Sequence, residues 1–336
     1  MISYKLRLKS LAALALTCGV VGYSQTSQST PTPWDNASAN QTVISLGSEA
    51  PVKGPLVVAT NSITCGLTKE IAGDTIDLKC LIDPGSDPHV YQPKPDDSKA
   101  IEQAKLILYG GYDFEPSLIK LIKTTSNYAF KVAVHEVAVP KPQKFEEDGK
   151  TVIDPHVWQN AQNGIAIAEV ISQELIKVAP NNAATYTRNT QKLTNEISLV
   201  DTWIKSQIAT IPSKQRKLVT THDAFGYYSK AYGIPIEGAL GNISTEEAPT
   251  SARVSALAIY IKQQGVPTIF AETTINPKLI TAVAKEAKVQ ISDRELFADG
   301  LGEKGTEAET YQGMLIANTR TIVEGLGGKY TEFKPR

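Results

Sequence analysis

Apolar and polar positions in the first half of the chain fall into short alternating blocks. Apolar runs at 56–60, 76–81, 106–109 and 131–134 are typical of strands buried in a parallel sheet. Helix-type sequence lies between them: Asn61 and Ser62 can cap a helix that ends at Ala72, and a second helix is expected from Asp96 to Ala104. Strands and helices that alternate at this spacing predict βαβ units and a parallel sheet.

The middle of the chain has longer stretches of helix-type sequence. A helix is expected from Ala161 to Val178, ahead of Pro180. No glycine or proline interrupts the stretch from Ala183 to Ile208, which predicts one long amphipathic helix. Its apolar face is formed by Tyr186, Leu193, Ile197, Val200, Ile204 and Ile208. At about 1.5 Å per residue this helix is roughly 39 Å long, so we expect it to connect two lobes rather than to pack inside one.

The last third of the chain repeats the strand and helix alternation. Strands are expected at 217–220, 268–272 and 289–291, and helices at 252–263, 277–287 and 309–326. The predicted fold class is therefore α/β, with two lobes built on parallel sheets and joined by one long rigid helix. The expected division is a signal peptide at 1–24, a flexible segment at 25–54, an N-terminal lobe at 55–182, a linking helix at 183–211 and a C-terminal lobe at 212–336.

The N-terminus has the features of an export signal. Lys5, Arg7 and Lys9 precede a short apolar region at 11–21, and cleavage is expected after Ser24. An alternative is that Cys18 accepts a lipid and tethers the protein to the outer face of the cytoplasmic membrane. Either way, the protein is expected outside the cytoplasm, in the periplasm or on that face.

Composition narrows the function classes. The chain has 336 residues, enough for two domains, and a formal net charge of −1. Because positive and negative charges nearly cancel, the chain lacks the excess of basic residues that is typical of nucleic-acid-binding proteins. No apolar run reaches the roughly 18 residues that span a bilayer. Apart from Cys18, the cysteines are Cys65 and Cys80, which in an exported protein suggest a disulfide. The alternative is two buried free thiols.

One tetrapeptide occurs twice and carries two of the 4 histidines. Asp87-Pro88-His89-Val90 lies in the proline-rich stretch 83–95, and the same four residues recur at 154–157 around His156. Prolines fix the backbone near His89, so the imidazole is held in place before a ligand arrives. A rigid loop that presents a histidine, made twice, favours a metal site. The alternative is two surface turns that share common turn residues.

His222 and Asp299 also follow predicted strands. Ligands of open α/β sheets bind beyond the carboxyl ends of the strands, so His89, His156, His222 and Asp299 are expected to meet in the cleft between the lobes. Three imidazoles and one carboxylate suit tetrahedral Zn²⁺, and also Mn²⁺ or Fe²⁺ if the carboxylate binds through both oxygens. His135 follows a strand too but lacks the proline frame, and we expect it to be structural or to face solvent.

Several motifs in order resemble the metal-receptor (zinc/manganese/iron) family of ABC-importer solute-binding proteins, of the cluster A-I type with a long inter-lobe helix. They are residues 83–95, 154–158, 221–228, 269–272, 295–299 and 310–314. The resemblance covers about 56–326. It implies two Rossmann-like lobes, the same four ligands, one Zn²⁺ or Mn²⁺ as transported cargo and no catalytic cofactor. It also implies an ABC permease as partner, and we expect a monomer.

The resemblance leaves the metal open. His222 stands where manganese receptors often have glutamate, which favours zinc, whereas the lack of a His-rich loop and the 295–314 segment favour manganese. A metal-dependent hydrolase is the main rival function, and a metal-binding adhesin is another. A catalytic zinc keeps an open position for water, which four protein ligands do not leave, and no His-Glu-x-x-His helix is present. We therefore expect a binding protein and not an enzyme.

Overall fold

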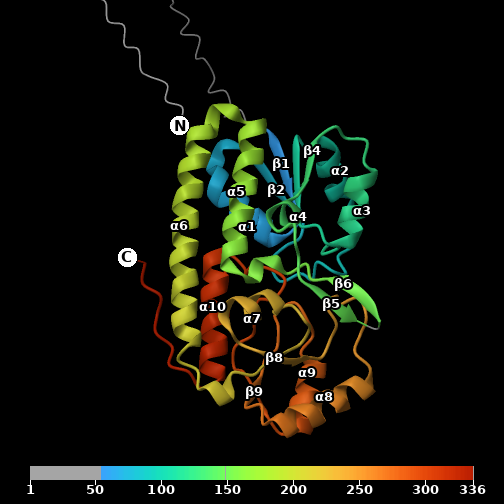
Figure 1. The fold of residues 1–336 in the computed structure, drawn as a ribbon. Helices are drawn as coiled ribbons and strands as arrows, with labels where there is room; N and C mark the ends of the chain where they lie inside the picture. Colours follow the sequence, from blue (N-terminus) through green and yellow to red (C-terminus); the bar gives the residue numbers. More distant parts are fainter. Residues whose placement is uncertain (1–53, 148, 336) are drawn as a thin grey trace, which may run out of the picture. The chain divides into compact units, whose positions relative to one another are not determined.

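A computed structural model describes residues 54–147 and 149–335, and Figure 1 shows their arrangement. The first sheet is parallel throughout, with its strands in the order β2-β1-β3-β4. These strands are β1 Leu56–Ala59, β2 Asp77–Cys80, β3 Leu106–Tyr109 and β4 Phe130–Ala133. The predicted βαβ organisation of the first lobe is confirmed.

The helices of this lobe begin and end where their caps place them. In α1, Ser62–Ala72, the Thr64 amide donates to Asn61 Oδ1 over 2.9 Å, and the helix stops at Gly73, whose φ of 54° favours glycine. Helix α2, Pro95–Gln103, begins with proline at its first position. Two short helices were not expected, α3 Pro116–Thr124 and α4 Val134–Ala138.

Helices α5, Ala161–Val178, and α6, Ala183–Ile208, have the predicted bounds. Helix α6 packs against α5, α1 and α10, as Figure 1 shows. The stripe expected to be apolar and buried is buried along its whole length, from Tyr186 to Ile208. Contacts with elements from both halves of the chain give α6 the connecting position predicted for it, and residues on both sides of it belong to one compact unit.

The second half also alternates strands and helices, but its strands are short. Parallel pairs are formed by β7 with β8 and by β9 with β10, and Phe270 N donates to Val219 O over 3.0 Å, which joins the two pairs. The strands are β7 Leu218–Thr220, β8 Ile236–Ala239, β9 Thr268–Ile269 and β10 Gln290–Ile291. The helices are α7 Gly226–Tyr232, α8 Ser251–Gln264, α9 Lys278–Ala287 and α10 Tyr311–Gly325. The strand expected at 268–272 ends early, and only an isolated parallel pairing of Glu272 with Leu296 follows it.

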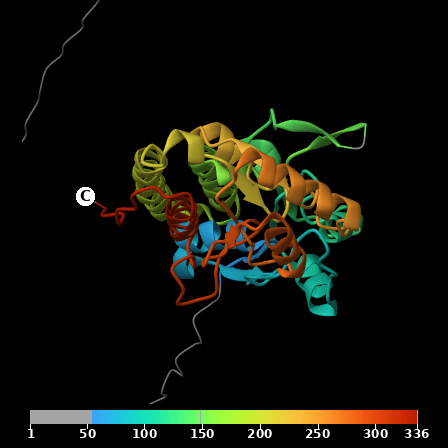
Figure 2. The same ribbon diagram turned by 90° about the horizontal axis from the view of Figure 1, so that it is seen from below.

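An antiparallel hairpin interrupts the α/β order. Its strands are β5 Lys144–Glu147 and β6 Lys150–Ile153, and Figure 2 shows it projecting from its neighbours. Single turns of 3₁₀ helix lie at Gly73–Thr75, Val157–Gln159, Pro180–Asn182 and Ser213–Gln215. The hairpin was not expected, and it delivers the chain directly to His156.

The predicted disulfide is confirmed. Cys65 of α1 is bonded to Cys80 at the end of β2, with 5.7 Å between the two Cα atoms. None of the helices in the described part of the chain is both long enough and apolar enough to cross a membrane. The expected leader at 1–24, Cys18 and nearly all of the flexible 25–54 segment lie outside the described residues.

Candidate metal centre

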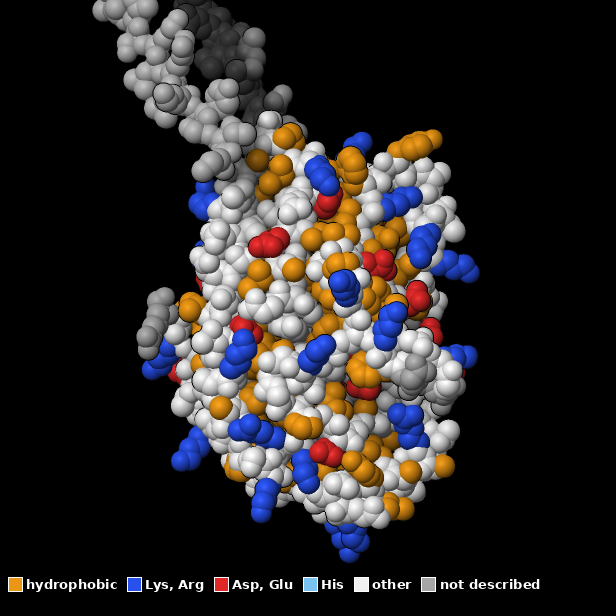
Figure 3. Space-filling model, in the orientation of Figure 1, with side chains coloured by type: hydrophobic (Ala, Val, Ile, Leu, Met, Phe, Trp, Pro, Cys, Tyr) orange, Lys and Arg blue, Asp and Glu red, His pale blue; other side chains and the backbone are white. Residues whose placement is uncertain are grey.

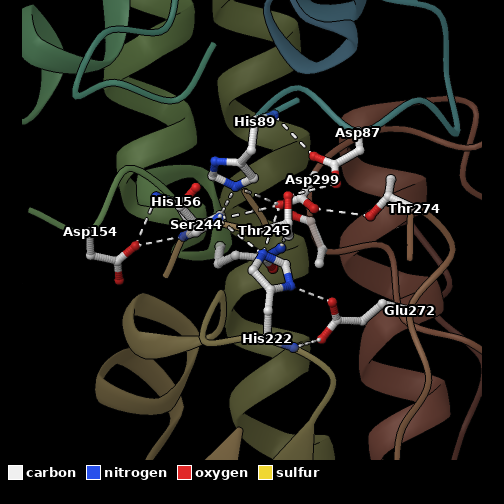
Figure 4. Close-up of polar contacts among 12 residues, drawn as sticks. Asp87, His89, Asp154, His156, His222, Ser244, Thr245, Glu272, Thr274 and Asp299 are labelled. Carbon is white, nitrogen blue, oxygen red and sulfur yellow. Dashed lines mark hydrogen bonds and ion pairs between the residues drawn. The ribbon is translucent and has the colours of Figure 1, made fainter. Parts of the chain in front are cut away.

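Four side chains from distant parts of the sequence converge on one point (Figure 4). The ligand atoms of His89, His156, His222 and Asp299 all lie within 4.8 Å of one another, and none of these residues is more than 2% exposed. On the face drawn in Figure 3 no histidine side chain is visible. The structure thus brings together all four residues that the sequence singled out.

The spacing of these atoms matches a coordination shell. His156 Nε2 lies 3.3 Å from His89 Nε2 and 3.4 Å from His222 Nε2. Asp299 Oδ1 lies 3.2, 3.3 and 3.8 Å from the Nε2 atoms of His222, His156 and His89, respectively. Ligands bonded to zinc at about 2.0 to 2.1 Å in a regular tetrahedron are separated by about 3.3 to 3.4 Å. The donor set and its dimensions therefore fit a single transition-metal ion.

The ligands are placed by four separate connections. His89 lies between β2 and α2, and His222 directly follows β7. Asp299 follows the pairing of Leu296 with Glu272. His156, expected just past a strand or on a following loop, follows β6 of the antiparallel hairpin. His156 is thus brought to the cluster by the hairpin and not by a parallel strand.

The repeated tetrapeptide forms the same turn twice. The amide of His89 donates to Asp87 Oδ1 over 3.0 Å, and the amide of His156 donates to Asp154 Oδ1 over 2.9 Å. Asp154 Oδ1 also lies 2.8 Å from His156 Nδ1, so this carboxylate orients the ring as well as the backbone. Asp87 instead uses its second oxygen to accept from Thr245 Oγ1, over 2.7 Å.

A second carboxylate orients His222. Glu272 Oε2 lies 2.5 Å from His222 Nδ1, and Glu272 Oε1 accepts from the amides of Thr221 and His222 over 2.9 and 3.1 Å. A proton held on Nδ1 by the carboxylate leaves the Nε2 lone pair aimed at the cluster. Sequence reasoning gave Glu272 no role. An acidic residue at the end of the neighbouring strand was the available signal.

The pKa values of the clustered side chains are shifted by the opposite charges that they bring together. Burial alone would lower the pKa of His156, but Asp154 and Asp299 outweigh it and raise the pKa. Burial would also lower the pKa of His222, but Asp299 and Glu272 raise it well above its usual value. Burial would raise the pKa of Asp299, yet the charge of His222 and the proximity of His156 and His89 bring it well below its usual range. A metal entering this cluster displaces protons.

Aromatic rings close one side of the cluster. The ring centroid of Phe114 lies 5.2 Å from that of His89, and Trp158 lies 5.4 Å from His156. The Trp158 indole also donates from Nε1 to Ala298 O over 3.1 Å, which fixes the backbone just before Asp299. This wall excludes water from the imidazoles and strengthens electrostatic interactions among them.

The fourth histidine, His135, lies behind this wall. Its ring centroid is 5.2 Å from that of Trp158 and 6.2 Å from that of Phe114. It is fully buried on α4, and neither ring nitrogen has a hydrogen-bond partner among the described residues. Burial, aided by the charge of His156, lowers its pKa to about 3. His135 is therefore a neutral packing residue, and the alternative of a solvent-facing position is wrong.

Comparison with known proteins agrees with this geometry. The family model described as ZnuA, zinc-uptake complex component A, periplasmic, matches residues 57–325. The manganese ABC transporter substrate-binding lipoprotein PsaA of Streptococcus mitis is 35% identical over 277 residues, which cover 80% of this chain and 88% of that protein. The chain belongs to the ZnuA family.

Two further relatives match over similar lengths. The metal ABC transporter substrate-binding lipoprotein FimA of Streptococcus parasanguinis is 36% identical over 290 residues, 84% of this chain and 93% of that protein. The solved structure of the periplasmic zinc binding protein TroA from Treponema pallidum superposes with a TM-score of 0.77 at 33% identity, covering 81% of this chain and 99% of TroA. By their names, PsaA and FimA are substrate-binding lipoproteins of metal ABC transporters, and TroA is a periplasmic zinc-binding protein.

Proposed function

We propose that this protein captures one divalent transition metal, Zn²⁺ or Mn²⁺, through His89, His156, His222 and Asp299, and delivers it to the permease of an ABC importer. The observation that carries the proposal is the convergence of four buried ligand atoms within 4.8 Å. The names of the relatives PsaA and FimA support a metal cargo and an ABC transporter, and the name of TroA supports zinc as cargo.

Binding without catalysis is the activity that this donor set favours. Three imidazoles and a carboxylate already supply the four ligands of a tetrahedral ion, whereas catalytic zinc has three protein ligands and a water. The ligands are buried, so a bulky substrate has no direct approach to the ion. We infer that the metal is cargo, not a catalytic cofactor.

The expected cellular arrangement follows from the same relatives, whose names include "lipoprotein" and "periplasmic". We propose an exported protein, either released by cleavage after Ser24 or tethered through Cys18. We further propose that it works as a monomer, with an N-terminal lobe at 55–182, a linking helix at 183–211 and a C-terminal lobe at 212–336. Ligands from both lobes would then hold the ion between them.

Native mass spectrometry of the purified exported protein tests the binding step. The wild type is expected to bind one Zn²⁺ or Mn²⁺, and His156→Gln to lose most of that affinity. His135→Gln is the matched control, because it removes the one histidine outside the cluster. Delivery is tested with the importer in proteoliposomes, where the loaded wild type should stimulate ATP hydrolysis and His156→Gln should not. Equal binding by both variants would exclude the proposed ligand set.

A further inference from the structure

The two oxygens of Asp299 have different surroundings. Oδ1 faces the three imidazoles at 3.2 to 3.8 Å and has no hydrogen-bond donor among the described residues. Oδ2 points away from them and accepts a hydrogen bond from Thr274 Oγ1 over 3.0 Å (Figure 4). Only one oxygen of this carboxylate is therefore presented to an ion.

The position of Thr274 is fixed by the same backbone that carries the site. Glu272, two residues earlier, pairs with Leu296, and the Thr273 amide donates to Leu296 O over 3.0 Å. The chain then runs from Leu296 to Asp299. The hydroxyl of Thr274 and the carboxylate that it contacts are thus held on two neighbouring, paired segments.

The other carboxylates beside the ligands do not face the ion's position: Asp154 contacts His156 at Nδ1, the ring edge away from the cluster. Asp87 has both oxygens engaged, one by the His89 amide and the other by Thr245. Glu272 uses both oxygens on His222 and on the backbone beside it. A fifth protein donor would have to come from Asp299 itself, by turning Oδ2 toward the ion.

We propose that Thr274 is a specificity-determining residue, which holds Asp299 as a one-oxygen ligand and so favours Zn²⁺ over Mn²⁺. The inference rests on the proposed function and deepens it. Four donors in a buried site suit tetrahedral Zn²⁺, whereas Mn²⁺ prefers more ligands and more oxygen among them. When Oδ2 is freed from the Thr274 hydroxyl, it can serve as a further oxygen ligand for Mn²⁺. The difference between the affinities for Zn²⁺ and Mn²⁺ then becomes smaller.

Competition between Zn²⁺ and Mn²⁺ tests this in three proteins: wild type, Thr274→Val and Thr274→Ser. Valine keeps the shape without the hydroxyl, and serine keeps the hydroxyl. The ratio of the Mn²⁺ to the Zn²⁺ dissociation constant should fall about tenfold in Thr274→Val, the scale of one hydrogen bond to a charged group, and should be retained in Thr274→Ser. Co²⁺ gives a second readout, because its visible absorption is strong in four-coordinate sites and weakens when further ligands bind. That absorption should weaken only in Thr274→Val.

The outcomes separate the two proposals. An unchanged ratio in Thr274→Val, or an equal loss of affinity for both metals, would overturn the role of Thr274 while leaving the metal site intact. Failure of the wild type to bind either metal would overturn the proposed function itself. A change of the same size in Thr274→Ser would show that the packing of the side chain matters rather than its hydroxyl, and would also count against the inference.

Discussion

Thr245 and Asp87 are joined by a 2.7 Å hydrogen bond, although 158 residues separate them in the sequence. Asp87 lies two residues before His89 and also accepts from the His89 amide. Thr245 lies in the 242–249 segment, whose start is held by a bond from Arg253 to Asn242 over 2.7 Å. The bond therefore ties the loop of the first histidine to the segment between β8 and α8.

Loss of this bond is expected to speed metal release. In Thr245→Val the ligands remain, but the His89 loop is no longer tied to the 242–249 segment. The dissociation rate should rise about tenfold, since a hydrogen bond to a charged group is involved. Stopped-flow mixing of loaded protein with a chelator measures it. The control is Thr281→Val, because that hydroxyl donates to the carbonyl of Pro277, the N-cap residue of its own helix α9. Equal rates in the two variants would exclude the coupling.

Glu272 should matter for affinity although it is not a ligand. Glu272→Gln keeps the size of the side chain but removes the charge that holds the proton on His222 Nδ1. Changes of this kind beside a metal ligand cost roughly 10 to 100-fold in affinity. Isothermal titration measures the loss, with Glu237→Gln as control, since Glu237 accepts from Tyr260 at the surface. An affinity unchanged by Glu272→Gln would show that packing alone orients His222.

His135 should make the metal-free protein less stable in acid. Its folded-state pKa of about 3 lies below the ordinary value of 6.5, so the unfolded chain takes up the proton first as the pH falls. The free energy of unfolding should drop by about 1.4 kcal/mol per pH unit below 6.5, relative to a variant that cannot titrate there. Urea unfolding of wild type and His135→Gln at pH 7.5 and 5 should differ in pH response by about 2 kcal/mol. If the free energy of unfolding changed equally with pH in wild type and His135→Gln, the proposed effect of His135 would be contradicted.

The disulfide is expected to act on stability and not on the metal. Cys65 and Cys80 are 15 residues apart, and closing such a loop contributes about 3 kcal/mol in the chain-entropy model. Replacing both cysteines by alanine should lower the free energy of unfolding by a few kcal/mol, because neither sulfur belongs to the ligand cluster. Denaturant titration together with zinc affinity checks both statements. A large loss of affinity in the variant would show that the bridge shapes the site.

Local signals explain what the sequence could predict. The apolar period of 183–208 fixed the bounds of α6, and the Asp-Pro-His-Val repeat pointed to His89 and His156. Helix α7 has 7 residues, too few to form alone, and it is held by contacts such as Tyr228 Oη to Thr319 Oγ1 at 2.9 Å. Partners such as Glu272 of His222 lie 50 residues away, and only the fold brings them together.

The most direct measurement is an anomalous diffraction map of crystals of the metal-loaded protein, recorded at the absorption edge of the bound metal. We predict one strong peak, bonded to the Nε2 atoms of His89, His156 and His222 and to Asp299 Oδ1, at about 2.0 to 2.2 Å. A peak elsewhere in the molecule, or one that lacks bonds to two or more of these four residues, would contradict the proposed metal site.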